Sequence, residues 1–322
     1  MNPGHRHTAR TIAAAVAGTA GAAWLAAHAT APAVRAWSPG GGIHTRVGRL
    51  TVRVADRPPE LPSRVATVLL HGLMASGDTY GASYDALADD GPLLVPDLLG
   101  FGRSMDTSVA VAGAFDLHAH VAALGTTIAG LVPEGMPVRI GGHSMGGVLA
   151  LHLAGQLIAQ GRPVARVVTW GAPLYRDRAV GLDRIATLSA MSRLFARDTP
   201  LAEVVCAAMC RFRRTAAVLA VAMSPRLPVP IARRGVLHTW GSYRQAFDTI
   251  VLDATWPDAL RTLGAADVAT RLVGGTSDPV IDPATLASAA HLSPTVETQL
   301  LSDATHELPL THARACRASL QA

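Results

Sequence analysis

The chain has 322 residues, of which 49% are hydrophobic and 16% are charged, so it has ample apolar surface for a core and is not a largely disordered protein. Its formal net charge is +5, and all basic side chains counted in it are arginines, because the sequence contains no lysine. The arginines are spread out, with no run longer than residues 211–214, and we expect no nucleic-acid partner. The three cysteines are too few for a disulfide framework, and without further Cys or His ligands nearby we expect no metal and no cofactor.

The first 36 residues have the order of an export signal. Two arginines precede a stretch at 11–34 that carries no charge, and the small residues at 27–29 and 31–33 fit an A-x-A cleavage site. The same stretch reaches the roughly 20 residues that a membrane span needs. We therefore expect an exported protein in which residues 1–36 are a cleaved signal peptide or a membrane anchor, with a cytoplasmic chain as the remaining alternative. Residues 37–42 then form a linker.

The folded domain is expected at 43–322. Residues 45–57 alternate apolar and polar side chains around a glycine, which predicts a β-hairpin. Helical periodicity marks residues 115–131. Apolar runs typical of buried strands lie at 65–72, at 92–104, at the start of 137–157, and at 164–174, 269–278 and 295–308. Strands that alternate with helices predict an α/β fold with a mainly parallel central sheet flanked by helices.

No strand pattern appears between residues 174 and 267, and most of this part is helix-like. We expect a helical lid at about 174–253, inserted before the penultimate core strand and lying over one end of the sheet. Its large apolar side chains suit an apolar acyl substrate, although their helical spacing is equally that of ordinary core residues. These side chains are Met191, Leu194, Phe195, Met209, Phe212 and Met223.

Four glycines surround Ser144 in the sequence GGHSMGG at 141–147, between the strand and the helix of 137–157. The pattern G-x-S-x-G in this context is typical of a strained turn that exposes a nucleophilic serine. Such a turn also leaves backbone N–H groups free at the start of the next helix. A purely structural glycine turn is the alternative.

A serine hydroxyl needs a base and a carboxylate that orients it. Asp278 ends the strand at 269–278, and His306 follows the last strand, 28 residues later. The carboxyl ends of parallel strands share one edge of the sheet, so both side chains are expected beside Ser144. A surface role is the alternative for His306. Competing carboxylates near these loops or at the start of the lid are Asp177, Asp282 and Asp303.

The N–H groups of Leu73 and Met145 are the predicted donors of an oxyanion hole. Leu73 follows the strand at 65–72, and Met145 follows the serine. The predicted substrate-binding residues are Met74, His143, Met191 and Phe195.

The order of five motifs resembles the α/β-hydrolase superfamily, in its lid-bearing branch of small esterases and lipases. These motifs are HGL at 71–73, DLLGFGRS at 97–104, GHSMGG at 142–147, GGTSDPV at 274–280 and ATH at 304–306. The resemblance covers nearly all of residues 44–322. It implies Ser144 as nucleophile, Asp278 as acid, His306 as base, and Leu73 and Met145 as oxyanion donors.

A serine at the nucleophile position points to acyl transfer, since relatives that open epoxides or remove halides carry an aspartate there. The expected activity is hydrolysis of a carboxylic ester, or a related acyl bond, through an acyl-enzyme. An acyltransferase or a cofactor-free perhydrolase with the same triad is an alternative, and a non-catalytic binding module is another. The expected partner is a small apolar acyl substrate, and membrane attachment follows only where the N-terminal segment is kept as an anchor.

Overall fold

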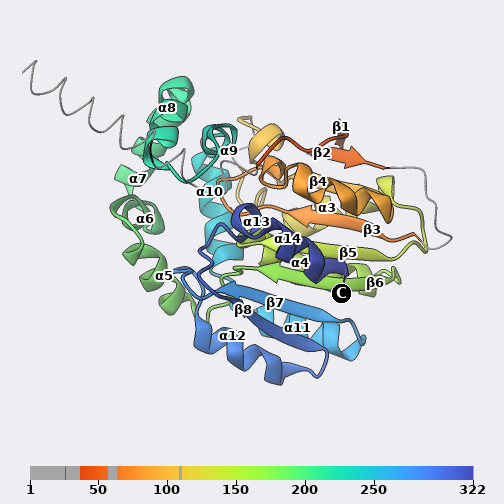
Figure 1. Cartoon of the computed structure of the whole chain (residues 1–322). Helices are drawn as coiled ribbons and strands as arrows, with labels where there is room; N and C mark the ends of the chain where they lie inside the picture. Colours follow the sequence, from red (N-terminus) through yellow and green to blue (C-terminus); the bar gives the residue numbers. More distant parts are fainter. Residues whose placement is uncertain (1–25, 27–36, 57–63, 109–110, 322) are drawn as a thin grey trace, which may run out of the picture.

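A computed structural model describes Ala26 and residues 37–56, 64–108 and 111–321 (Figure 1). The expected signal peptide or anchor at 1–36 lies outside the described residues, apart from Ala26. No helix in the described part of the chain is long and apolar enough to cross a membrane.

Eight strands form one mixed sheet in the order β1-β2-β4-β3-β5-β6-β7-β8. Their bounds are β1 Ile43–Val47, β2 Leu50–Ala55, β3 Ala66–Leu70, β4 Leu93–Asp97, β5 Val138–His143, β6 Val164–Trp170, β7 Thr270–Gly275 and β8 Val296–Leu301. The predicted hairpin is β1–β2, which pairs antiparallel with itself and with β4, while β3 to β8 pair in parallel. The predicted α/β architecture with a mainly parallel sheet is confirmed.

Apolar residues of the central strands alternate between the two faces of the sheet, which is why their sequences are continuous apolar runs. Val68 and Leu70 of β3 pack into one core layer, whereas Leu69 packs into the other. Val167 and Val168 of β6 divide in the same way. Both faces of the sheet must therefore be covered by helices.

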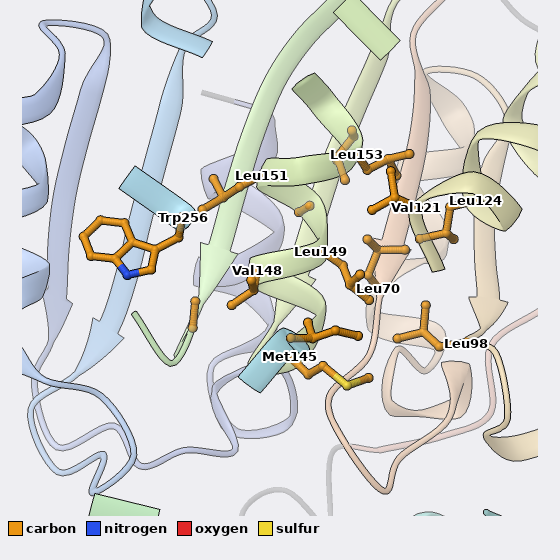
Figure 2. Packing of buried hydrophobic residues seen from close by; sticks show 14 of the residues in the cluster. Leu70, Leu98, Val121, Leu124, Met145, Val148, Leu149, Leu151, Leu153 and Trp256 are labelled. Atoms are coloured by element: carbon orange, nitrogen blue, oxygen red, sulfur yellow. The ribbon is translucent and has the colours of Figure 1, made fainter. Parts of the chain in front are cut away.

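One face is covered by α3 Leu117–Leu131, α4 Met145–Ala159 and α11 Trp256–Ala265. Asp116 begins α3, because its carboxylate accepts a hydrogen bond from the Ala119 N–H at 2.8 Å. Figure 2 shows Val148 and Leu149 of α4 packed with Leu70 of β3 in this layer.

The other face is covered by the 3₁₀ helix η2 Ala82–Asp89 and by α14 Ala313–Gln321. Trp170 of β6 lies at the centre of this layer, with its ring centroid 6.0 Å from that of Tyr80 and 6.4 Å from that of Tyr84. The remaining short helices are η1 Gly77–Thr79, η3 Gly102–Ser104, α12 Pro283–Ala289, η5 Ala290–Leu292 and α13 Leu308–Thr311.

A helical insert joins β6 to α11, in the region where the sequence predicts a lid. Most of its helices lie beyond the carboxyl ends of the parallel strands (Figure 1), whereas the last one contacts α4. They are α5 Arg178–Thr187, α6 Ala190–Ala196, α7 Pro200–Arg211, α8 Arg213–Met223, α9 Val229–Arg234, α10 Trp240–Ala246 and the π-helix η4 Phe247–Val251. That this insert opens and closes as a lid stays a prediction.

Candidate active site

Ser144 occupies the turn between β5 and α4. Its φ of 53° and ψ of −123° lie outside the conformations that residues other than glycine usually adopt, so the turn is strained. The Ser144 N–H donates to the Trp170 carbonyl at 2.8 Å, and the Ser144 carbonyl accepts from the Gly147 N–H at 2.8 Å. These two bonds hold the strained backbone in place. The Ser144 hydroxyl hydrogen-bonds none of the residues that the structure describes.

Two glycines permit this turn because strand and helix approach each other too closely for any side chain. A Cβ atom at Gly142 would lie 2.0 Å from the Gly146 carbonyl oxygen. A Cβ atom at Gly146 would lie 2.2 Å from the carbonyl oxygen of Leu70 in β3. The motif has glycine at both positions because a Cβ atom at either one would clash with the backbone.

Asp278 and His306 form a hydrogen-bonded pair at the carboxyl edge of the sheet. His306 Nδ1 lies 2.9 Å from Asp278 Oδ2 and 3.1 Å from Oδ1, and Oδ1 also accepts the Val280 N–H at 2.8 Å. Asp278 is only 6% exposed, so these hydrogen-bond donors, and not solvent, stabilise its negative charge. The His306 Nδ1–H is thereby directed at the carboxylate, which leaves Nε2 as the free nitrogen of the neutral ring.

Burial and hydrogen bonding act on the pKa of Asp278 in opposite directions. Burial raises the pKa, while the hydrogen bond and charge of His306 and the Val280 N–H lower it. The net effect lowers the pKa of Asp278 below its usual value. The carboxylate is therefore ionised at neutral pH, as a partner of an imidazolium must be.

The three competing aspartates make other hydrogen bonds. Asp177 caps α5 by accepting the Val180 N–H at 2.9 Å. Asp282 accepts the hydroxyl of Thr285 at 2.6 Å. The N–H of Asp303 donates to Thr276 Oγ1 at 2.9 Å, in a turn where the φ of Asp303 is 57°. None of them hydrogen-bonds His306 in the described part of the chain, so only Asp278 of the four is placed beside the histidine.

His143, the residue before Ser144, contacts the His306 loop directly. Its Nε2 lies 2.7 Å from the His306 carbonyl oxygen, and the two ring centroids are 4.8 Å apart. Burial and the nearby His306 charge lower the pKa of His143 to about 3, so the ring is neutral and donates from Nε2. Sequence analysis assigned His143 to substrate binding and missed this contact. It lines the same cavity as Ser144, but one of its nitrogens is committed to holding the His306 backbone.

The loop with the predicted oxyanion donor Leu73 is fixed by His71. His71 Nδ1 lies 2.8 Å from the Gly72 carbonyl oxygen, and Nε2 accepts the Leu98 N–H at 2.8 Å. The histidine thus ties the loop after β3 to the loop after β4. Met74, the next residue, has a φ of 56°, so the loop turns sharply beside the cavity. The sequence motif HGL does not predict this role of the histidine, because the role depends on a contact with a neighbouring loop.

A cavity of about 400 Å³ opens beside Ser144 and His306. Leu73 and all four predicted substrate-binding residues, Met74, His143, Met191 and Phe195, contribute to its wall. Most of the remaining wall is apolar and comes from the insert. Its side chains there include Met209, Leu219, Met223, Leu227, Ile231 and Val236. That these residues bind substrate stays a prediction, but the structure brings them together around one space.

Two of the insert residues expected to suit an acyl chain lie elsewhere. Leu194 packs against the core. Phe212 is 61% exposed at the junction of α7 and α8 and is absent from the cavity wall. Helical spacing alone could not separate these positions, because the insert helices have both a cavity side and an outer side.

A second, open depression meets the cavity at His306 and Glu307. Its wall is more polar and includes Asp183 and Arg184 of α5. The Arg184 guanidinium donates to the Ile281 carbonyl at 2.9 Å and so stays close to the loop that carries Asp278. His306 therefore lies between the strongly apolar cavity and a depression whose wall mixes apolar and polar side chains.

Cys206 and Cys210 lie one turn apart on α7, and Cys206 is buried. Within the described ranges, no cluster of three or more His, Cys, Asp or Glu side chains is arranged to hold a metal ion.

A family of known proteins matches most of the chain. Residues 67–318 match the family described as "Alpha/beta hydrolase family", which is more than half of the chain. A search of curated proteins found no significant match.

Solved structures share the fold at low sequence identity. A thioesterase domain from the curacin biosynthetic pathway is 20% identical, with a TM-score of 0.56 over 88% of this chain and 100% of its own. An enol-lactonase from Burkholderia xenovorans is 18% identical, with a TM-score of 0.57 over 87% of this chain and 98% of its own. An esterase from Exiguobacterium antarcticum is 16% identical, with a TM-score of 0.58 over 87% and 98%.

Proposed function

We propose that this chain, which belongs to the alpha/beta hydrolase family, is a serine hydrolase that cleaves carboxylic esters with an apolar acyl group through an acyl-enzyme. One observation carries the proposal. Ser144, in a strained turn, and His306, which is hydrogen-bonded to Asp278, line one cavity whose remaining wall is mostly apolar. Titratable groups that converge on an apolar cavity are the usual mark of an active site.

In the first half of the reaction, His306 Nε2 removes the proton of the Ser144 hydroxyl as Oγ attacks the ester carbonyl carbon. Asp278 accepts the Nδ1–H throughout and stabilises the imidazolium. The negative charge that forms on the carbonyl oxygen is stabilised by the N–H groups of Met145 and Leu73. The tetrahedral intermediate collapses when the alcohol leaves with the proton from His306, and the acyl group remains on Ser144.

In the second half, His306 removes a proton from a water molecule that attacks the acyl-enzyme. The second tetrahedral intermediate uses the same two N–H donors. The bond between the acyl carbon and Ser144 Oγ breaks, Oγ regains a proton from His306, and a carboxylic acid is released. Met145 is the first residue of α4, so the positive end of the helix dipole favours the developing negative charge.

We place the acyl chain in the apolar cavity and the leaving alcohol toward the depression, whose wall is the more polar of the two. Both spaces meet at His306, which has to protonate the leaving oxygen. Arg184 and Asp183 in the depression suit an alcohol with polar groups. An ester with an apolar acid part and a polar alcohol part fits this division.

The test is hydrolysis of p-nitrophenyl esters of increasing acyl length by the wild type and by Ser144→Ala. Loss of hydrolysis in Ser144→Ala with an unchanged unfolding curve is expected, together with covalent labelling of wild-type Ser144 by a fluorophosphonate probe. Full activity in Ser144→Ala would exclude the mechanism. Failure of the probe to label Ser144 would favour a non-catalytic binding module.

The same enzyme preparation separates hydrolysis from acyl transfer. With a primary alcohol added as acceptor, a hydrolase forms the carboxylic acid as its main product. An excess of the new ester over the acid would instead assign the protein to the acyltransferases.

A further inference from the structure

We propose that the outer face of α7 and α8 docks on an anionic lipid bilayer, so that substrate enters the cavity from the membrane. The substrate part of this proposal rests on the proposed function, whereas the docking does not. Six of the ten large apolar side chains that are exposed in the described part of the chain lie on these two helices and their junction. They are Leu201, Val204, Phe212, Val218, Leu219 and Met223, here called the outer patch.

The outer patch follows the periodicity of the helices. Leu219 and Met223 are four residues apart, so they lie on one side of α8, and Phe212 immediately precedes this helix, seven residues before Leu219. Each of the three is more than half exposed. Figure 1 shows α8 on the outer side of the insert, away from the sheet. Single exposed apolar residues are normal on protein surfaces, but a group of them on one protruding element marks an interaction site.

The outer patch is continuous with the candidate active site. Leu219 and Met223 both line the cavity beside Ser144 and are 56% and 62% exposed. The same two side chains therefore form the wall of the cavity and part of the outer surface. An acyl chain that leaves an apolar phase at this patch passes into the cavity without crossing water.

The charge around the outer patch fits an anionic surface. Residues 190–235 contain eight arginines and two acidic residues, a net charge of +6, whereas the whole chain has +5. Arg211, Arg214, Arg226 and Arg233 are exposed there, and the Arg211 guanidinium lies 5.9 Å from the centre of the Phe212 ring. A helix pair with apolar side chains and flanking arginines has the composition of an interfacial membrane-binding element.

The first residue of the described domain lies close to a loop that is ion-paired with α9. Trp37, where the described domain begins, donates from Nε1 to the Asp78 carbonyl at 3.1 Å. The Asp78 carboxylate pairs with Arg234 at the end of α9, and α9 packs against α8. The 36 residues before Trp37 include the uncharged stretch expected to act as a signal or anchor. An anchored chain would thus present the outer patch to the bilayer that holds its N-terminus.

The test uses the full chain and lipid vesicles made of equal parts phosphatidylcholine and phosphatidylglycerol with brominated acyl chains, which quench nearby tryptophan. Phe212→Trp adds a reporter in the outer patch. Leu300→Trp, at a similarly exposed apolar position on β8, is the matched control. We expect extra quenching beyond the parent chain for Phe212→Trp and none for Leu300→Trp. Arg211→Gln with Arg214→Gln should weaken the partition of the patch roughly 30-fold.

Three results would overturn the proposal. Binding of the parent chain to vesicles without extra quenching of Phe212→Trp would leave the N-terminal segment as the only contact. A blue shift of the added tryptophan that grows with protein concentration and needs no vesicles would place a second copy of the chain on the patch. A blue shift at every concentration without vesicles would place the chain's own N-terminal segment there.

The catalytic test uses two double variants. Phe212→Ser and Val218→Ser together remove apolar side chains of the outer patch that lie outside the cavity wall, and Ile43→Ser and Leu300→Ser together are the control. Hydrolysis of a long-chain ester within vesicles should fall about tenfold or more for the first pair only. Hydrolysis of a short soluble ester should be the same for both pairs. If no ester is hydrolysed by the parent chain, the proposed function fails, and the quenching result still decides the docking.

Discussion

Replacement of Asp278 by asparagine tests the proposed mechanism most directly, because the structure predicts which way the new amide turns. Asp278 Oδ1 accepts the Val280 N–H at 2.8 Å, and only an oxygen can take that position. The NH₂ group of the introduced asparagine must then face His306 Nδ1, where Asp278 Oδ2 now lies at 2.9 Å. A donor at this place forces Nδ1 to accept a hydrogen bond and leaves the proton on Nε2.

With the proton on Nε2, His306 cannot accept the proton of Ser144. Loss of the correct tautomer in a Ser-His-Asp triad lowers turnover by about 10⁴, or roughly 5.5 kcal/mol of barrier. We expect a loss of 10³- to 10⁴-fold in kcat/KM for a soluble p-nitrophenyl ester, an equally slowed reaction of Ser144 with a fluorophosphonate, and little change in KM.

Asp282→Asn is the matched control, because Asp282 hydrogen-bonds Thr285 and not His306. It should retain most of the wild-type activity. A loss of less than about tenfold in Asp278→Asn, with the unfolding midpoint unchanged, would refute the reasoning about the tautomer. A larger loss of activity in Asp282→Asn than in Asp278→Asn would show that Asp278 is not the acid of the triad.

Three further predictions concern the strained turn at Ser144, the contact of His143 with the His306 loop, and the effect of pH on stability. Gly146→Ala should fail to fold or lose several degrees in its melting temperature, since its Cβ would lie 2.2 Å from the Leu70 carbonyl oxygen; circular dichroism measures this, and a wild-type melting curve would contradict it. His143→Phe keeps the ring but removes the donor to the His306 carbonyl, so kcat/KM should fall about tenfold, with partial recovery in His143→Gln; equal activity in all three would leave His143 without a positioning role. Burial lowers the pKa of His238 to about 4, so the folded state binds its proton less readily than the unfolded state, and the stability that the neutral ring contributes is complete above pH 6.5 and is lost as the pH falls toward 4. Other buried histidines, His143 among them, add to the acid loss of the wild type, so the prediction concerns the difference: urea unfolding should show a loss smaller by roughly 3 kcal/mol at most in His238→Gln than in the wild type.

The central sheet was predictable because its strands are buried on both faces. The continuous apolar run VATVLL is typical of an internal strand. The change to helical spacing after Ser144 located the turn between strand and helix. The pairing of His306 with Asp278 followed from the rule that parallel strands end at one edge. These features depend on local sequence and on topology.

Other features depend on contacts between distant segments, which no local pattern records. The bond from His143 to the His306 carbonyl joins positions 163 residues apart. Phe212 and Met209 are both large apolar residues and are three positions apart in the sequence, yet only Met209 lines the cavity. Their difference arises from how the insert packs over the sheet, and helical spacing does not contain it.

The hydrogen bond from His143 to the His306 loop has a consequence for protein engineering. The residue between the glycine and the serine of an elbow motif is a natural choice for randomisation, because its side chain borders the cavity. In this chain the same side chain fixes the backbone of the general base. A library intended to alter acyl-chain preference should therefore vary Leu219, Met223 and Ile231 and leave position 143 as histidine.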